Sequence, residues 1–177
     1  MSRRSLALAM SLPLVAAVAA PAAAGHHGEA PEASRGAVVH QVELHALNDS
    51  GVQGKAVLVQ RDGVLRVHLT ARGLEPDMLH PQHIHGLPGS AEATCPPASA
   101  AGDDGVLTLV EGLPYYGGVL VDLAPYTTAP QGHINYHRTF EVTGDVADLT
   151  DEAIVVHGAF VDGQYVASLP VACGTID

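Results

Sequence analysis

Apolar and polar side chains alternate along short segments of the chain from residue 38 onward. The clearest segment is VLRVHLTA (64–71), where Leu, Val, Leu and Ala alternate with Arg, His and Thr. Successive side chains of a β-strand point to opposite faces, so this period of two predicts a strand with one buried face. The triplet RDG (61–63) comes directly before it, and Asp-Gly beside an alternating segment indicates a hairpin turn.

Other short segments predict further strands, and turn-forming residues separate them. The expected strands cover residues 38–47, 51–60, 64–71, 80–86, 105–111, 117–123, 133–142, 153–161 and 170–176. Residues 87–104 are rich in Pro, Ala, Ser and Gly, so we expect an irregular loop there. No long helical period, internal repeat or second domain is evident. The pattern favours an all-β fold, a sandwich or flattened barrel, over residues 37–177.

The N-terminal segment has the composition of an export signal. Arg3 and Arg4 precede an apolar run that is short for a membrane span, and small residues at 22–24 offer a cleavage site. We therefore predict a signal peptide over residues 1–24 and a flexible tail over 25–36. The arginine pair also suggests a twin-arginine signal, but the residues that normally follow one are missing. The mature protein is expected to be secreted or periplasmic, with no membrane attachment after cleavage.

Composition narrows the classes of partner. The formal net charge is −11, with 19 acidic residues against 8 lysines and arginines, which makes nucleic acid an unlikely ligand. The chain has 11 histidines, and histidine is the commonest side-chain metal ligand, so the count is a reason to look for a metal site. A solvated, lysine-poor composition without chemistry is the alternative interpretation.

The only two cysteines are Cys95 and Cys173. In an oxidising compartment they favour one disulfide, with two unpaired buried thiols or a link between chains as alternatives. A disulfide that closes so long a loop is expected to contribute roughly 4 kcal/mol to stability.

The motif His83-Ile84-His85 carries the most chemical information. On a strand, residues i and i+2 share a face, so both imidazoles are close enough to bind one ion while Ile84 points into the core. An H-x-H motif alone is equally compatible with histidines that face solvent or are satisfied by hydrogen bonds.

Four segments in order resemble the Cu/Zn superoxide dismutase family. They are GVQGKAVLV (51–59), ARGLEPDMLHPQHIHG (71–86), AIVVHG (153–158) and VACGTI (171–176). The second is similar to the family's copper strand, the third to its L-V-V-H-E strand, and the fourth to its L-A-C-G-V-I terminus. The resemblance covers roughly residues 37–177, and it implies an eight-stranded Greek-key β-sandwich.

The resemblance also implies roles for individual residues. His83, His85 and His157 match three copper ligands, and Cys95 and Cys173 match the two halves of the family's disulfide. His80 matches a buried histidine that binds no metal, so we expect it to hydrogen-bond the backbone of its loop.

Two departures from the family pattern affect the expected function. Residues 96–132 contain no histidine, so the family's bridging histidine and zinc site are missing, and copper rather than zinc is the expected cofactor. The position of the arginine that draws superoxide to copper is occupied by Pro170. Two hypotheses follow: a copper-only superoxide dismutase with a reduced three-histidine site, or a non-catalytic secreted module that binds copper or serves as a scaffold. A chordin-type (CHRD) domain is a further form of the second hypothesis.

Several other polar residues are weaker candidates. His133 and His137 share a predicted strand face about 13 Å apart, too far to share one ion, so we expect them to face solvent. The acidic residues Asp103, Asp104 and Glu111 are more typical of turns than of metal sites. Tyr115 and Tyr116 are expected to pack or cap.

The predicted mature N-terminus offers a second candidate site. Cleavage after residue 24 would begin the chain with Gly25-His26-His27. An amino group, two backbone amides and a third-position imidazole can bind Cu(II) or Ni(II) in a square plane. The alternative is a tail that contains histidines by chance.

Overall fold

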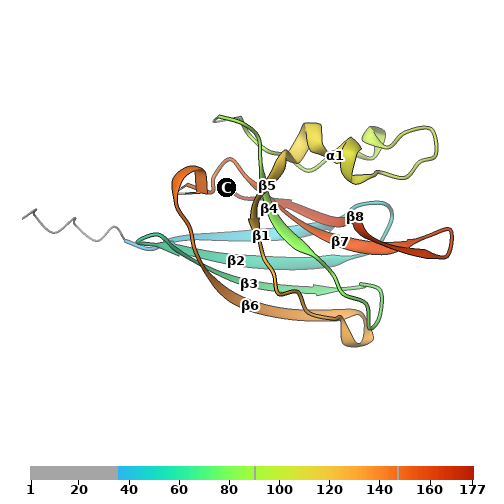
Figure 1. The fold of residues 1–177 in the computed structure, drawn as a ribbon, viewed down its shortest axis with the longest axis horizontal. Helices are drawn as coiled ribbons and strands as arrows, with labels where there is room; N and C mark the ends of the chain where they lie inside the picture. Colours follow the sequence, from blue (N-terminus) through green and yellow to red (C-terminus); the bar gives the residue numbers. More distant parts are fainter. Residues whose placement is uncertain (1–35, 90, 147) are drawn as a thin grey trace, which may run out of the picture. The chain divides into compact units, whose positions relative to one another are not determined.

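Antiparallel β-strands are the main secondary structure in the computed structural model, which describes residues 36–89, 91–146 and 148–177 (Figure 1). The strands are β1 (Val38–Ala46), β2 (Gln53–Arg61), β3 (Val64–Arg72), β4 (Gln82–Gly86), β5 (Gly118–Asp122), β6 (His133–Glu141), β7 (Ala153–Val161) and β8 (Gln164–Thr175). They form one curled sheet in the order β5-β4-β7-β8-β1-β2-β3-β6. The prediction of an all-β fold is therefore confirmed.

Strand β1 connects the two parts of this sheet. It pairs with β2 from Val38 to Leu44, but it pairs with β8 only through His45 and Ala46. Because the pairing changes from one neighbour to the other along a single strand, the sheet bends at this point. The bend brings the apolar faces of both parts into one core.

Two of the hairpins turn on an Asp-Gly pair. Asp62 and Gly63 join β2 to β3, and Asp162 and Gly163 join β7 to β8. All four residues have positive φ, between 49° and 80°, as a two-residue type I′ turn requires. The first turn was predicted, but the second was not, so the last strand begins at residue 164 rather than 170.

One predicted strand is wrong. Residues 105–111 lead into the helix α1 (Leu109–Tyr116) instead of forming a strand. Thr108 caps this helix: its hydroxyl accepts from the Glu111 backbone N–H, and the Glu111 carboxylate accepts from the Thr108 N–H at 2.8 Å. This reciprocal capping box satisfies two backbone donors and stabilises the helix end, and it outweighs the strand propensity of Val and Leu.

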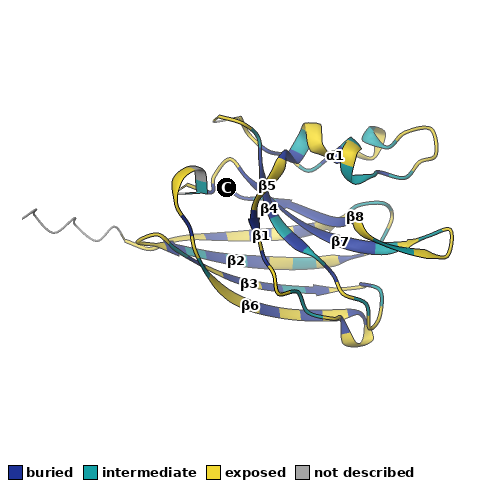
Figure 2. Ribbon diagram, viewed as in Figure 1, coloured by how far each residue is buried: buried dark blue, intermediate teal, exposed yellow. Residues whose placement is uncertain are grey.

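The main core lies on the inner face of the curled sheet. Leu65, Val67 and Leu69 of β3 are fully buried while the side chains between them are exposed, and Figure 2 shows this alternation along β2, β3 and β6. Ile84 of β4 is 0% exposed and belongs to the same core, as predicted. The fully or almost fully buried members of this core include Leu58, Leu65, Val67, Leu69, Ile84, Ile154, Val156 and Val171.

A smaller apolar cluster covers the other face of β7 and β8. Val155 and Cys173 are neighbours in the ladder and belong to this second cluster, whereas Ile154 and Val156 belong to the main core. Tyr116 of α1 packs on these residues and belongs to the same cluster. The strands β7 and β8 are therefore buried on both faces along this stretch.

The disulfide between Cys95 and Cys173 joins the covering segment to β8. The two Cα atoms are 5.7 Å apart, and no other cysteine exists in the chain. The predicted disulfide is thus present, and neither alternative for the two cysteines applies. We refer to residues 91–117, which contain Cys95 and α1, as the cover.

Some predictions concern residues outside the described part of the chain. The signal peptide (1–24), His26 and His27, and all but the last residue of the predicted tail belong to this group. Within the described ranges, the chain has no helix that is both long and apolar enough to cross a membrane.

Candidate metal centre

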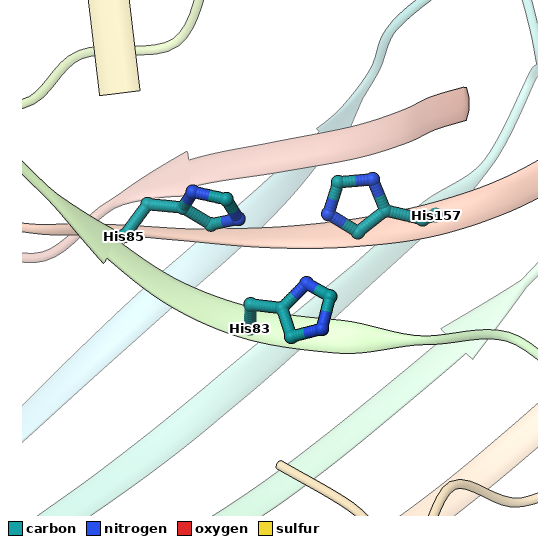
Figure 3. A group of neighbouring side chains, drawn as sticks. All are labelled: His83, His85 and His157. Carbon is teal, nitrogen blue, oxygen red and sulfur yellow. The ribbon is translucent and has the colours of Figure 1, made fainter. Parts of the chain in front are cut away.

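Three histidines from two neighbouring strands meet beneath the cover. His83 and His85 come from β4 and His157 comes from β7, which pairs with β4. One ring nitrogen from each lies within 4.8 Å of the others, and the ring centroids are 5.1 to 5.7 Å apart. Figure 3 shows the three rings turned toward one another. The structure therefore brings together the three residues that the sequence singled out.

Local irregularities of the ladder orient His157. The β7–β8 register shifts on both sides of this residue, which lies opposite Pro170. Proline has no N–H to donate to the His157 carbonyl, which lies 3.0 Å from Nδ1 of His80, while the His157 N–H donates to the Pro81 carbonyl on the β4 side at 2.8 Å. Gly158 follows with φ of +108°, and a Cβ there would lie 2.0 Å from the Tyr165 hydroxyl. Such a bulge turns a side chain away from regular alternation.

Backbone carbonyls fix the tautomers of two of the rings. Nδ1 of His85 is 3.0 Å from the Gly117 carbonyl, and Nδ1 of His157 is 3.1 Å from the Ser168 carbonyl. A carbonyl oxygen only accepts, so each Nδ1 carries the hydrogen. The lone pair of each neutral ring is therefore on Nε2.

His83 is held by a side chain instead. Its Nε2 is 3.0 Å from the hydroxyl of Tyr126, and that hydroxyl donates to Oδ1 of Asp122. Because the hydroxyl hydrogen goes to Asp122, the Tyr126 oxygen accepts from Nε2–H of His83. The lone pair of this ring is therefore on Nδ1.

The three nitrogens that carry lone pairs have no hydrogen-bond partner among the described residues. They are Nδ1 of His83, Nε2 of His85 and Nε2 of His157, and all three are buried. A buried polar atom without a partner costs roughly 1–3 kcal/mol, so three that converge require an explanation. A metal ion bound by all three lone pairs would satisfy them together. The donor set fits such an ion, because imidazole nitrogens are common ligands of transition metals.

Burial keeps these rings neutral. It lowers the pKa of His157 to about 3 and that of His85 to about 4. Burial also lowers the pKa of His83, although the nearby Asp122 charge opposes this change. The neighbouring rings of His83 and His85 further lower the pKa of His157, and His83 lowers that of His85, as expected for groups that converge on one point. Neutral imidazoles are the form that binds a metal.

Surrounding aromatic and histidine side chains enclose the centre. The ring of Tyr116 lies 4.7 Å from that of His85, and Tyr116 is fully buried with its hydroxyl donating to the Leu109 carbonyl. The prediction that this tyrosine packs is confirmed. His80 is also fully buried, with one ring nitrogen 3.0 Å from the His157 carbonyl and the other 3.1 Å from the Glu75 carbonyl. His80 thus contacts the backbone of its surroundings, as predicted.

The weaker candidates lie apart from this cluster. His133 and His137 are exposed on β6, as predicted. Glu111 caps α1, and Asp104 accepts from the Val106 N–H in a turn. Among the described residues, no other histidine, cysteine or carboxylate joins the group of three.

The sequence interpretation missed the groups that orient the rings. Tyr126 and Asp122 were not singled out, and the carbonyls of Gly117 and Ser168 carry no signal in the side-chain sequence. One signal existed for Asp122: it lies at the end of a predicted strand, and in the structure it pairs directly with His83 in the ladder. Without the order of the strands, that pairing was not deducible.

Comparisons with known proteins give no family assignment. No protein-family model matches the chain, and no curated protein matches it significantly. The function must therefore be argued from the chemistry of the three-histidine centre.

Proposed function

We propose that the protein is an exported, superoxide dismutase-like copper protein that binds one copper ion through His83 Nδ1, His85 Nε2 and His157 Nε2. The observation that carries this proposal is the convergence of three buried, unpartnered lone pairs on neutral rings. Each ring is held by a hydrogen bond at its other nitrogen, which is how metal-binding histidines are usually oriented.

The choice of copper rests on the ligand set. Copper has the highest affinity in the divalent series for nitrogen ligands. Structural zinc sites almost always have four protein ligands, and no fourth candidate lies within the group among the described residues, which disfavours a structural zinc site. Catalytic zinc sites do use three histidines, so zinc competes with copper in the test below. Three imidazoles can also hold Cu(I), so the site suits both oxidation states.

The scaffold supports a relationship to the superoxide dismutase family. The H-x-H segment lies on β4, the V-V-H segment lies on the neighbouring β7, and a disulfide ties Cys95 to the A-C-G segment of β8. The eight antiparallel strands are compatible with the Greek-key sandwich that the resemblance implies. The disulfide and the apolar N-terminal segment support export.

Superoxide dismutation is the activity that this relationship suggests. Bound copper would supply the one-electron cycling that the reaction needs. The side chain of His83 is 18% exposed, whereas His85 and His157 are almost fully buried, so a small anion would approach from the His83 side.

A second candidate function is copper binding without catalysis, and the charge distribution favours it. The lysine and arginines of the described residues all lie on β2, β3 and β6: Lys55, Arg61, Arg66, Arg72 and Arg138. Beside His83, the exposed charged group is instead the carboxylate of Asp122, with its Oδ1 3.7 Å from Nε2. An anionic group at the entrance repels superoxide, which would slow dismutation. A scaffold module of the chordin type is a further form of this candidate.

Metal analysis tests the binding site. The exported protein is expected to retain one copper per chain after exposure to equimolar copper and zinc. The His83→Ala and His157→Ala variants should lose it, and the control His137→Ala should not. All variants carry His26→Ala and His27→Ala, which removes the possible N-terminal site. Circular dichroism confirms folding, and stoichiometric copper in His83→Ala would contradict the proposal.

Superoxide consumption then separates the two candidate functions. Stopped-flow rates for the copper-loaded protein are compared with those of the same copper concentration in buffer. A rate well above that background, lost in His83→Ala, supports a dismutase. A rate at or below the background supports a copper-binding protein without catalysis.

A further inference from the structure

The hydrogen-bond partner of His83 differs in kind from the partners of the other two candidate ligands. His85 and His157 donate to backbone carbonyls, whereas His83 donates to the hydroxyl of Tyr126. A carbonyl only accepts, but a hydroxyl accepts and donates, so it can link the ring to a third group. That third group is the carboxylate of Asp122.

Asp122 and Tyr126 are both held in position. Asp122 lies opposite His83 in the β4–β5 ladder, and its Oδ1 accepts from the Ala124 N–H at 3.0 Å. The ring of Tyr126 stands nearly perpendicular to the ring of His83, with centroids 5.9 Å apart. Burial, together with Asp122, raises the pKa of Tyr126, so its hydroxyl remains a donor at neutral pH.

We propose that Tyr126 and Asp122 are positioning residues that select the Nδ1 lone pair of His83 for metal binding and strengthen that ring as a ligand. The proposal rests on the function proposed above and adds the groups that control one of the three ligands. The proposal predicts that the neutral ring of His83 is the Nε2–H tautomer even in the metal-free protein.

The tautomer of His83 decides whether the centre can form. With hydrogen on Nδ1, the ring would point an N–H bond at the lone pairs of His85 and His157, and only two ligands would remain. Nε2–H is selected because it alone can donate to the Tyr126 oxygen. The Asp122 carboxylate accepts from the Tyr126 hydroxyl and polarises it, so the hydroxyl oxygen accepts more strongly from Nε2–H of His83. This increases the electron density on Nδ1 and makes its lone pair a stronger metal ligand.

Nuclear magnetic resonance of the metal-free protein tests the selection without any copper. Ring nitrogen shifts at pH 8 are expected to show His83 as the Nε2–H tautomer in the wild type. In Tyr126→Phe, which removes only the hydroxyl, a substantial Nδ1–H population should appear. Tyr115→Phe is the matched control, because the Tyr115 hydroxyl forms no hydrogen bond with a described residue. A His83 that remains fully Nε2–H in Tyr126→Phe would overturn the proposal.

Copper affinity tests the consequence. Competition with a chelator is expected to show a 10- to 100-fold loss of affinity in Tyr126→Phe, the usual effect of removing such a partner, and no change in Tyr115→Phe. Asp122→Asn keeps an oxygen that can accept from the hydroxyl but removes the charge, so its loss should be smaller. The electron paramagnetic resonance spectrum of Cu(II) should change in the same order. Equal affinity and identical spectra in all three variants would also contradict the proposal.

The two proposals fail in different ways. If the wild type binds no copper, the proposed function is wrong, but the tautomer measurement still decides whether Tyr126 positions His83. If copper binds through the three histidines and Tyr126→Phe changes neither tautomer nor affinity, only the positioning role is wrong.

Discussion

Two groups of strands in the same sheet differ in the exposure of their histidine side chains. We call β2, β3 and β6 the exposed half and β4, β7 and β8 the covered half. His68 and His137 of the exposed half lie opposite each other with ring centroids 6.0 Å apart, close to the spacings within the candidate centre. Yet both are exposed, and His68 hydrogen-bonds the Asn135 side chain at 3.0 Å.

The difference lies in what covers the sheet. In the exposed half, one face packs on the core and the other meets water, so residues alternate between buried and exposed. In the covered half, Ala153 to Gly158 of β7 are all buried, because the cover and its disulfide close the second face. Proximity of histidines is therefore not what distinguishes the candidate centre. Burial with one fixed hydrogen bond per ring leaves each remaining lone pair without a partner among the described residues, so the three could bind a metal ion.

The largest expected effect comes from releasing the cover. The double substitution Cys95→Ala/Cys173→Ala removes the tie between the cover and β8. It should lower the free energy of unfolding by about 4 kcal/mol, measured by urea denaturation of the metal-free protein. Hydrogen exchange should rise first in residues 91–117 and on β7 and β8, while β3 and β6 change little. A loss below about 1 kcal/mol, or uniform exchange, would mean that the cover does not depend on the disulfide.

The second largest effect is expected from acid, which should lower the stability of the metal-free protein through the buried histidines of the covered half. In the folded protein the pKa of His85 is lowered to about 4 and that of His157 to about 3, whereas in the unfolded chain both are near 6.5. As pH falls below 6.5, the unfolded chain therefore binds more protons than the folded protein. Stability of the metal-free protein should therefore decrease between pH 6.5 and 3. The slope is roughly 1 kcal/mol per pH unit for each group.

Glu152 opposes this trend over part of the range. Burial raises its pKa to about 7, so it stabilises the folded state as pH falls from 7 to 4.5. The net loss between pH 6.5 and 5 should then be roughly 2 kcal/mol, and Glu152→Gln should steepen it. Denaturation midpoints at several pH values provide the measurement. Constant stability over this range would show that the histidines are not buried in neutral form.

A matched pair of valines compares the outward faces of the two halves. Val155 of β7 is fully buried under the cover, whereas Val59 of β2 is half-buried. Threonine has nearly the same shape as valine, so Val155→Thr buries a hydroxyl and should cost about 1–2 kcal/mol. Val59→Thr should stay within about 0.5 kcal/mol of the wild type. If both variants lost the same free energy of unfolding in thermal or urea denaturation, the two faces would be equally accessible to water.

The smallest effect is expected at the exposed histidines. His68→Ala and His137→Ala should each change the free energy of unfolding by less than about 0.5 kcal/mol, as measured by urea denaturation. Copper stoichiometry should also be unchanged. Loss of copper in either variant would place a metal-binding group on the exposed half and would remove the contrast between the two halves.

Much of the strand pattern was predictable because alternation is local. The period of two in β3 and the Asp-Gly turn before it specify a hairpin without reference to the rest of the chain. The helix at Leu109–Tyr116 was missed, although Thr108 and Glu111 have the spacing of a capping box. The doubly buried strand β7 lacks alternation between buried and exposed residues over Ala153 to Gly158, because both of its faces are covered there.

The sequence by itself determined the three candidate ligands, the two cysteines and an all-β pattern, because motif spacing and residue type are properties of the chain. Only the tertiary structure decided that β4 lies beside β7, that the cover seals the outer face, and that Tyr126 and Asp122 hold His83. Those features depend on contacts between residues far apart in the chain, and no local pattern specifies them. The proposed metal centre therefore depends on a local H-x-H motif together with non-local burial and hydrogen bonding.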